Sequence, residues 1–421
     1  MKGTLLDQIL SDENLKTAYQ RVYQNQGMAG VDKMTVTALK GYLKKNQSKL
    51  KKLIRDGQFK PQPVLRVEIP KDDGDVRLLG IPTVVDRLIQ QAIYQVIRPV
   101  FERQFHDDSY GYRPNKSGEM AVRRSLDLLN AGYVWVVDLD LERFFDMVNQ
   151  DKLMHVLSRT IKDRAIQTLI RNYLTSGVMV KGRFHQSTRG VSQGSPLSPL
   201  LSNIVLNELD QRLASKGLKF VRYGDDLLIF TRSSFAAKRV MKSVSRYITT
   251  QLDLVVNKAK SKVSQPTEVK FLGFGFAKIK SWRAIPHPES VKKFQQKMKA
   301  LTDRKLHLSL NERNKRIKQS IQGWVVYFRM AEMKELLVQL DNELKFRMRV
   351  IIWKDWVAQN KQIISLVKLG IASKEAERLA WNLKSDRSIG NSKILRQALS
   401  DRRLKEMGIV SIVDCYLEYR V

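Results

Sequence analysis

The chain contains 421 residues, of which 75 are Lys or Arg and 42 are Asp or Glu, so its formal net charge is +33. This charge excludes an ordinary metabolic enzyme and favours a polyanionic partner, because each cation that neutralises a phosphate releases condensed counterions. At roughly 100–200 residues per domain the length predicts two to four domains. The 43% of hydrophobic residues can fill their cores.

The scarcity of cysteine and histidine limits the chemistry. Cys415 is the single cysteine and the five histidines are scattered, so we expect neither an intramolecular disulfide nor a zinc site. No stretch of about 18 uncharged apolar residues occurs, which predicts a cytosolic protein with no export signal and no membrane partner. Nucleic acid is therefore favoured over an anionic membrane surface as the polyanion.

The first 60 residues predict helices, because Leu5, Leu6, Ile9 and Leu10 recur at helical spacing. Two glycines in the run GMAGVDKMT at residues 27–35 interrupt the pattern. A later helix carries a Lys-rich face, which either is solvated or lies against phosphates; its members are Lys44, Lys45, Lys49, Lys51 and Lys52.

Residues 61–285 alternate between strand and helix patterns. Residues 61–82 and 219–231 each predict a hairpin, around Asp-Gly and Gly-Asp turns respectively, and residues 178–190 predict another. The intervening segments predict a helix over 84–100 that ends near Pro99, an apolar strand over 133–138, helices up to about residue 175, and a helix that begins after the turn residues of SQGSPLSP. Strands separated by helices indicate an α+β domain with a mainly antiparallel sheet.

Beyond residue 285 the strand signals nearly vanish and helices dominate. Ser309 and Glu312 fit a capping box, and an apolar stripe follows at helical spacing: Ile317, Ile321, Trp324 and Phe328. We place a domain boundary near 285–290 and a weaker one near 370. Basic residues crowd this all-helical part of the chain.

Adjacent carboxylates give the strongest chemical signal. Asp225 and Asp226 lie between apolar runs, where a buried carboxylate must be paired, protonated or metal-bound, although an Asp-Asp hairpin alone is more often a solvated turn. Asp140 at the end of an apolar strand shifts the balance, because together with Asp225 it could hold two Mg²⁺ ions about 4 Å apart for nucleotidyl transfer. Mg²⁺ prefers carboxylate and phosphate oxygens, and Mn²⁺ is an alternative.

These residues belong to an ordered set of motifs that resembles group II intron reverse transcriptases/maturases, most closely the short class C type without an endonuclease domain. The resemblance covers nearly the whole length, through the segments RVEIPKDDGDVRLLGIP, SYGYRPNKSG, VVDLDLERFFDMVNQDKL, GVSQGSPLSPLLSNIVLNELD, RYGDD, LVVNKAKSKV, FLGFGF and IQGWVVYF. It implies a right-hand polymerase with an N-terminal RNA-binding extension (1–60), fingers and palm (61–285), a helical thumb or maturase domain (286–370) and a C-terminal DNA-binding region (371–421).

The resemblance also implies residue roles at the metal and the nucleotide. Asp140, Asp225 and Asp226 correspond to the catalytic, metal-binding carboxylates. The basic pair that grips the incoming triphosphate corresponds to Lys71 and Arg77, although basic residues beside a turn are more often solvated. The loop that packs under the nascent base pair corresponds to Gln193 and Gly194.

Further roles follow in the same way. Phe145 corresponds to the aromatic residue that abuts the sugar and leaves no room for a ribose 2′-hydroxyl, whereas Phe144 is an ordinary core residue unless the two are exchanged. Asn257 and Lys260 support the palm or the nucleotide. We also predict nucleic-acid contacts for a set of basic residues: Arg113, Lys292, Lys293, Lys297, Arg313 and Arg316.

Two departures from the family pattern keep alternatives open. Gly224 stands where Ala is usual and Ser195 where Gly is usual. Neither change is expected to abolish catalysis, but both fit a domesticated enzyme of DNA repair or phage defence as well as a mobile-intron protein. A splicing-only maturase is the non-enzymatic alternative, and the intact carboxylates argue against it. A viral RNA-dependent RNA polymerase would have a second Asp at the position of Phe145, and a retron-type enzyme fits FLGFGF and the helical C-terminus less well.

We therefore expect a bacterial, cytoplasmic RNA-directed DNA polymerase of group II intron type. Its expected partners are an RNA template such as group II intron RNA, a DNA primer or target, and dNTPs. It would copy RNA into cDNA, assist splicing and retrotransposition, and act as a monomer or a homodimer. Template binding should weaken steeply with added salt.

Overall fold

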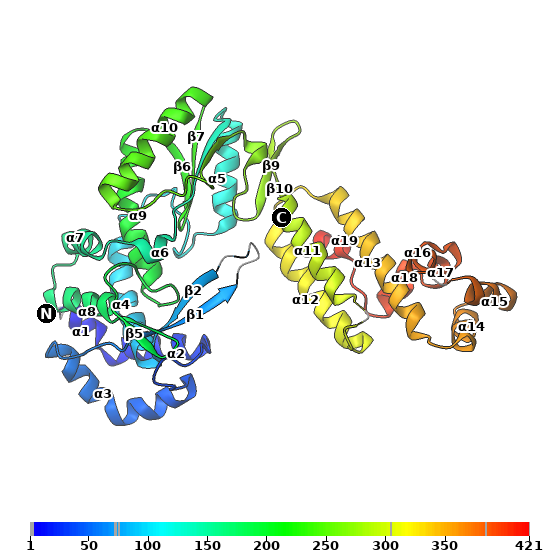
Figure 1. Cartoon of the computed structure of the whole chain (residues 1–421), viewed down its shortest axis with the longest axis horizontal. Helices are drawn as coiled ribbons and strands as arrows, with labels where there is room; N and C mark the ends of the chain where they lie inside the picture. The colour runs from blue at the N-terminus through cyan, green and yellow to red at the C-terminus, as the bar shows by residue number, and fades with distance from the viewer. Residues whose placement is uncertain (1–3, 71–73, 75, 304, 384, 421) are drawn as a thin grey trace. The chain divides into compact units, whose positions relative to one another are not determined.

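The computed structural model describes residues 4–70, 74, 76–303, 305–383 and 385–420, and the chain forms two compact units, Met1–Pro266 and Thr267–Val421 (Figure 1). The predicted domain boundary near 285–290 lies after the division that the contacts give, because the hairpin formed by residues 274–286 belongs to the second unit.

The first unit combines helices with two four-stranded sheets. Its helices are α1 (Leu5–Ile9), α2 (Asp12–Gln24), η1 (Val36–Ala38), α3 (Leu39–Arg55), α4 (Val84–Glu102), α5 (Gly118–Asn130), α6 (Phe144–Met147), α7 (Gln150–Thr160), α8 (Arg164–Thr175), α9 (Ser198–Ser215), α10 (Ser234–Tyr247) and the π-helix η2 (Ile248–Leu252). Its strands are β1 (Val64–Pro70), β2 (Val76–Ile81), β3 (Trp135–Leu139), β4 (Val178–Val180), β5 (Arg183–His185), β6 (Lys219–Tyr223), β7 (Asp226–Thr231) and β8 (Lys262–Ser264).

The sheet that contains the predicted fingers hairpin, called the fingers sheet below, has the strand order β2-β1-β4-β5. Strands β1 and β2 form the predicted antiparallel hairpin, in register from Leu65 opposite Ile81 to Pro70 opposite Val76, and β4 joins β1 in parallel. The hairpin predicted over 178–190 is confirmed but shorter, since β5 ends at His185. The following residues leave the sheet to reach the site described below.

The sheet of the predicted palm region, called the palm sheet below, has the strand order β6-β7-β3-β8 and is antiparallel throughout, as the sequence predicts. Successive side chains of a strand point to opposite faces. Val137 and Leu139 of β3 enter the main hydrophobic core together with residues of α4, α7, α9 and α10, so Asp138 between them faces the opposite side. The helices thereby cover one face at β3 and leave the acidic side chains on the other.

Helix α4 lies at the centre of this core. Thr83 caps it by accepting a hydrogen bond from the backbone N–H of Asp86, and its buried stripe includes Leu88, Ile89 and Ile93. The helix was expected to end near Pro99 but continues to Glu102. A proline in the last turn removes one intrahelical hydrogen bond without preventing the few residues after it from staying helical.

The second unit contains one hairpin followed by helices. Its elements are β9 (Phe274–Lys278), β10 (Trp282–Pro286), α11 (Pro288–Leu301), α12 (Leu310–Phe328), α13 (Lys334–Asp355), α14 (Gln359–Lys368), α15 (Ser373–Asn382), α16 (Asp386–Asn391), α17 (Lys393–Ala398), α18 (Asp401–Glu406) and α19 (Ile412–Tyr419). Helix α12 packs against α11 and α19, and α13 packs against α16 and α19. The predicted helical character of this part is confirmed.

The start of α12 shows how local sequence fixes a helix end. The Ser309 hydroxyl accepts a hydrogen bond from the backbone N–H of Glu312 at 3.3 Å, which is half of the predicted capping box. The Glu312 carboxylate instead accepts from Arg316 at 2.8 Å. Of the predicted apolar stripe, Trp324 is only half-buried; it stacks on Phe294 with ring centroids 4.6 Å apart.

In the part of the chain that the structure describes, no helix is both long and apolar enough to cross a lipid bilayer.

Candidate active site

The pairing of β3 with β7 brings the predicted carboxylates together. Leu139 lies opposite Leu227, so continuing the same register by one residue sets Asp140 opposite Asp226, and Asp225 is the next residue along the turn. Asp140 and Asp225 are half-buried and Asp226 is exposed. Two sequence segments far apart in the chain thus place three carboxylates at one end of the palm sheet.

The turn that carries Asp225 and Asp226 is a two-residue hairpin connection. Tyr223 pairs with Asp226, so Gly224 and Asp225 are its central residues, and residues 223–226 are called the catalytic turn below. Gly224 has a φ of +67°, which favours glycine at the first central position of a hairpin turn. A Cβ at Gly224 would also lie 3.0 Å from Cε2 of Tyr112, so the residue that departs from the family pattern suits both the backbone and the space.

The segment 109–112 packs directly against the catalytic turn. A Cβ on Gly111 would come within 2.2 Å of the Gly224 backbone nitrogen, so only glycine fits there. The Tyr110 N–H donates to the Arg222 carbonyl at 2.8 Å, which ties this segment to β6. The motif SYGYRPNKSG is therefore a support for the turn.

The backbone of Asp140 is held by the segment that follows η2. Its N–H donates to the Ser261 hydroxyl at 3.0 Å, and its carbonyl accepts from the Asn257 N–H at 2.9 Å. The Asn257 side-chain oxygen accepts from the backbone N–H groups of Ala259 and Lys260, at 3.1 and 3.2 Å, which shapes the loop. Asn257 thus lies where its predicted supporting role requires it. The Lys260 side chain is exposed. Ser261 lies within the same motif, but its role is not predicted from the sequence.

A further acid lies beside Asp140. Asp138 is opposite Leu228 on one side and Lys262 on the other. The pKa of Asp138 is raised to about 6, mainly by burial; the positive charge of Lys262 opposes the rise, and the negative charge of Asp140 adds to it. The sequence motif DLDLERFFD contains Asp138, but its role was not predicted.

The two phenylalanines after Asp140 have different surroundings. Phe144 is 2% exposed and belongs to the core, whereas Phe145 is half-buried; their rings meet edge-on with centroids 5.4 Å apart. The Phe145 carbonyl accepts from the Val191 N–H at 2.7 Å, and a Cβ on Gly190 would lie 2.9 Å from the same oxygen. Phe145, and not Phe144, has the accessible ring that the predicted sugar contact requires.

The loop of Gln193 and Gly194 is fixed against the fingers sheet. The Gly80 N–H donates to the Gln193 carbonyl at 2.6 Å, and a Cβ on Gly194 would lie 2.6 Å from the Gly80 carbonyl. Ser195, the second departure from the family pattern, is 7% exposed, and its N–H donates to the Ser192 carbonyl at 3.2 Å. The loop is therefore positioned by β2 on one side and leads into α9 on the other.

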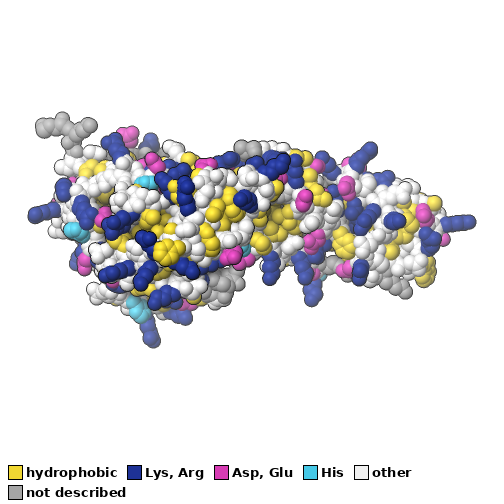
Figure 2. Space-filling view, turned by 90° about the horizontal axis from the view of Figure 1, so that it is seen from above, with side chains coloured by type: hydrophobic (Ala, Val, Ile, Leu, Met, Phe, Trp, Pro, Cys, Tyr) yellow, Lys and Arg dark blue, Asp and Glu magenta, His cyan; other side chains and the backbone are white. Residues whose placement is uncertain are grey.

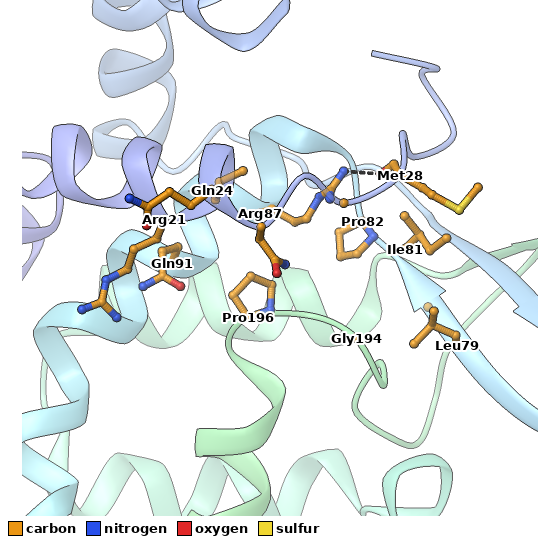
Figure 3. Close-up of a pocket in the computed structure, with 14 residues that line it drawn as sticks. Arg21, Gln24, Met28, Leu79, Ile81, Pro82, Arg87, Gln91, Gly194 and Pro196 are labelled. Atoms are coloured by element: carbon orange, nitrogen blue, oxygen red, sulfur yellow. Dashed lines mark hydrogen bonds between the residues drawn. The ribbon is translucent and has the colours of Figure 1, made fainter. Parts of the chain in front are cut away.

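A pocket of about 790 Å³ opens beside this loop (Figure 3). Figure 3 shows Pro196 and Gly194 on one side of it and side chains of α2 and α4, among them Arg21 and Gln91, on the other. Arg87 is buried in its wall and donates to the Met28 carbonyl at 2.5 Å. The GMAGVDKMT run packs here because Gly27 lies against the Arg87 guanidinium and a Cβ on Gly30 would lie 2.8 Å from the Thr83 backbone.

Of the predicted triphosphate-binding pair, the structure describes only the backbone of Arg77. Lys71 falls outside the described residues. Arg77 belongs to β2, where its backbone lies opposite Ile69. Their role in gripping a triphosphate stays a prediction.

Two of the basic residues predicted to bind nucleic acid are instead engaged inside the protein. The Arg113 side chain is 5% exposed, pairs with Glu102 at 2.7 Å, and donates to the carbonyls of His106 and Ser109. Arg313 is 4% exposed and donates to the carbonyls of Leu301, Asp303 and Leu306. With these donors occupied, both arginines support loops, and we withdraw the predicted nucleic-acid contact.

The other predicted contacts lie on the surface of the second unit. Lys292, Lys293 and Lys297 are exposed on α11, and Arg316 is exposed on α12, where it pairs with Glu312. These residues have the accessibility that a phosphate contact requires. Figure 2 shows further Lys and Arg side chains spread over the face in view.

The three carboxylates offer the oxygen donors that a divalent ion of the Mg²⁺ type prefers. Among the described residues, no group of three or more His, Cys, Asp or Glu side chains is placed so that it could hold a metal ion. Mg²⁺ bound with a nucleotide usually takes only one or two carboxylates and completes its shell with phosphate oxygens and water. The arrangement of Asp140 opposite Asp226, next to Asp225, fits such a shared site.

Two family models match the chain in sequence order. Residues 69–276 match the model described as reverse transcriptase (RNA-dependent DNA polymerase), and residues 291–365 match the model described as group II intron, maturase-specific domain. The first segment contains the sheet of β6, β7, β3 and β8 together with β2 and the end of β1, and the second contains α12, α13 and most of α11.

Curated relatives match part of the chain. Protein YkfC of Escherichia coli is 39% identical over 193 residues, which cover 45% of this chain and 51% of YkfC. The group II intron-encoded protein LtrA of Lactococcus lactis is 34% identical over 206 residues, which cover 49% of this chain and 34% of LtrA. Nuclear intron maturase 1, mitochondrial, of Arabidopsis thaliana is 24% identical over 33% of this chain and 27% of its own length. The chain thus spans about half or less of these relatives.

Proposed function

Because the chain belongs to the group II intron reverse transcriptase/maturase family, we propose that it is an RNA-directed DNA polymerase that copies RNA into cDNA from dNTPs. One observation carries this proposal: the β3–β7 register sets Asp140 opposite Asp226 and beside Asp225. Around these acids, the accessible ring of Phe145 and the loop of Gln193 and Gly194 supply the surfaces that a nucleotide needs.

The carboxylates would hold the metal ions of the reaction. We propose Mg²⁺, with Mn²⁺ as a substitute, held by Asp140, Asp225 and Asp226. When bound, two such ions supply activation of the primer 3′-hydroxyl and neutralise the departing pyrophosphate. The protein's own part is to aim the three carboxylates, and it does so through the backbone contacts of Asn257 and Ser261 to Asp140 and through the hairpin geometry of the catalytic turn.

The neighbouring residues would select the substrate. The Phe145 ring, whose backbone is held by the hydrogen bond from the Val191 N–H to the Phe145 carbonyl, would leave no room for a 2′-hydroxyl and so favour dNTPs. Gly194 would allow the nascent base pair to approach the loop closely. The adjoining pocket, lined by Arg21, Gln91 and other polar side chains, would receive the template strand as it reaches the site.

The experiment is primer extension on an RNA template with Mg²⁺, using dNTPs or rNTPs in separate reactions. We expect extension with dNTPs, little with rNTPs, and none with Asp225→Ala. Undiminished extension by Asp225→Ala would overturn the metal assignment, and a preference for rNTPs would overturn the role of Phe145. No extension by the wild type on RNA or DNA templates would overturn the polymerase proposal itself.

A second function, assistance to intron splicing and mobility, is favoured by the match of residues 291–365 to the maturase-specific domain. The partner would then be group II intron RNA. Gly224 and Ser195 also fit an enzyme that has been adapted to DNA repair or phage defence. The genomic context separates the two: intron ribozyme domains should flank the coding sequence of a maturase, and their absence would leave the adapted polymerase.

A further inference from the structure

A buried ion pair lies directly beneath the catalytic turn. The side chains of Arg222 on β6 and Asp210 on α9 are 1% and 0% exposed, and they are joined by two hydrogen bonds, from Nε at 2.8 Å and from Nη2 at 2.5 Å. Removing two charges from water is costly, and a buried pair is often no more stabilising than apolar residues of similar size. The pair therefore calls for an explanation other than stability.

The remaining contacts of Arg222 supply that explanation. Its Nη1 donates to the Gly224 carbonyl at 2.8 Å and to the side-chain oxygen of Asn203 at 2.9 Å. With the two bonds to Asp210, four hydrogen bonds engage a guanidinium that has five N–H groups in a rigid plane. The guanidinium is thus fixed by α9 and in turn fixes one carbonyl of the catalytic turn.

Helix α9 presents its two anchors on one face. Asn203 and Asp210 are separated by about two helical turns, so both point toward β6. On β6, strand alternation puts Arg222 on the same face as Phe220, which lies in the core that α9 shares. Asn203 also donates to the Gly111 carbonyl at 2.9 Å, so the same side chain holds the segment that packs on the other side of the turn.

The Gly224 carbonyl belongs to the central peptide of the turn, between Gly224 and Asp225. Two types of hairpin turn have a φ near +60° at the first central residue. In type I′ the second central residue also has a positive φ, and in type II′ it does not. They differ by rotation of this central peptide. Gly224 has a φ of +67°, and Asp225 is not among the described residues with positive φ, so the turn is of the second kind. Rotation of the peptide would change φ of Asp225 and redirect its carboxylate.

We propose that Arg222, held by Asp210 and Asn203, is a positioning residue that locks the central peptide of the catalytic turn and thereby aims the Asp225 carboxylate. The inference rests on the proposed polymerase function for its catalytic consequence. A glycine at position 224 permits both peptide orientations, so the hydrogen bond from Arg222 decides between them.

The test replaces the pair by apolar residues of similar volume, in Arg222→Met/Asp210→Leu. Such a change leaves no unpaired buried charge, so the variant is expected to fold. We expect kcat for dNTP incorporation to fall by about 10²-fold, as a small misplacement of a reacting group can cause. The KM for the primer–template should stay within about twofold, and half-saturating Mg²⁺ should rise. Mn²⁺ binding, measured by electron paramagnetic resonance without substrates, should weaken as well.

Leu169→Ala is the matched control. Leu169 is 5% exposed in the same core and lies on α8, which packs against α1 and α7. Its truncation should lower the melting temperature but leave the rate per active molecule and Mn²⁺ binding unchanged. A folded double variant with wild-type kcat and wild-type Mn²⁺ affinity would overturn the proposal.

Arg222→Lys is the second variant. It keeps a positive charge opposite Asp210 but lacks the planar guanidinium, so it should show the same loss of kcat and Mn²⁺ affinity. Wild-type values in folded Arg222→Lys would contradict the positioning role of Arg222. Failure of both variants to fold would also count against it, because the proposal assigns the pair a local role. If the wild type extends no primer, the proposed function fails, and Mn²⁺ binding still decides whether Arg222 aims Asp225.

Discussion

The palm sheet and helix α11 use positive charge in opposite ways. Arg222 on β6 is buried, and four hydrogen bonds commit it to one place, whereas Lys292 and Lys297 on α11 are exposed. A buried charge that is held by several hydrogen bonds fixes the positions of the groups around it. An exposed charge attracts a polyanion, and added salt screens this attraction. Changes in the palm should therefore alter the rate of chemistry, and changes on α11 should alter binding.

The largest expected effect comes from the catalytic turn. Asp225→Asn keeps the shape of the side chain and removes its charge, so the transition-state stabilisation expected from the proposed metal-binding carboxylate is lost. Several kcal/mol of such stabilisation correspond to a rate at least about 10³-fold lower. Single-turnover dNTP incorporation measures the rate, and fluorescence anisotropy of labelled primer–template measures binding. If Asp225→Asn also lost primer–template affinity, the palm sheet and α11 would not differ in the way described here.

The second largest expected effect is on the selection of dNTPs over rNTPs. Phe145→Ala removes the ring that is proposed to exclude the ribose hydroxyl, so the ratio of kcat/KM for dNTPs to that for rNTPs should fall by about 10- to 100-fold. Phe144→Leu is the comparison, since Phe144 lies in the core and should change stability without changing the ratio. An unchanged ratio in Phe145→Ala would remove this residue from the substrate site.

A smaller effect is expected at the glycine of the turn. Gly224→Ala places a Cβ 3.0 Å from the Tyr112 ring at a φ of +67°, so we expect kcat to fall several-fold. Gly132→Ala is the matched control, because Gly132 has a φ of +89° but no neighbouring atom within 4 Å of the added Cβ. It should lose stability and keep its rate. Equal rates in both variants would show that the space beside Tyr112 is irrelevant.

On α11 the expected change is in salt dependence. Lys292→Gln/Lys297→Gln should lower the slope of log affinity against log salt by about 2 and leave the rate at saturating template unchanged. Lys238→Gln/Lys242→Gln on α10, which removes two exposed lysines from the first unit, shows how much of any effect is due to net charge alone. Identical slopes in the two variants would mean that α11 has no special contact.

The smallest effect concerns stability alone. Burial raises the pKa of Asp86 to about 6, although hydrogen bonds from Thr83 and Gln62 oppose the shift. The folded state therefore holds this proton more tightly than the unfolded state, and stability is lost as the pH rises from about 4 to 6. Between pH 4 and 6, the free energy of unfolding of Asp86→Asn should fall by about 1–3 kcal/mol less than that of the wild type. The extension rate should be unchanged. Denaturant unfolding at several pH values measures this, and parallel profiles would contradict it.

The sequence was informative where a pattern repeats or a motif is local. Strand alternation and turn residues predicted the fingers hairpin and the β6–β7 hairpin, and the motif order located Asp140, Asp225 and Phe145. The register that brings Asp140 opposite Asp226 depends on strands almost 90 residues apart, which no local pattern specifies.

Buried arginines were the main failure of sequence reasoning. The sequence predicts nucleic-acid contacts for Arg113 and Arg313, because a basic side chain looks the same in a sequence whether it contacts a phosphate or a carbonyl oxygen. Only the fold shows that carbonyls surround them. The role of Arg222 is likewise not predicted from the sequence. Its partner Asp210 lies on α9, and no local pattern shows that this helix packs against β6.

The most direct test of the central claim is a pre-steady-state burst experiment on an RNA template with a single correct dNTP. The wild type, Asp225→Asn and Lys292→Gln/Lys297→Gln are compared at several salt concentrations. The account predicts a dNTP-dependent burst for the wild type, loss of the burst rate with unchanged primer–template affinity for Asp225→Asn, and an unchanged burst rate with weaker, less salt-sensitive binding for the lysine variant. A wild-type burst rate in Asp225→Asn would contradict it.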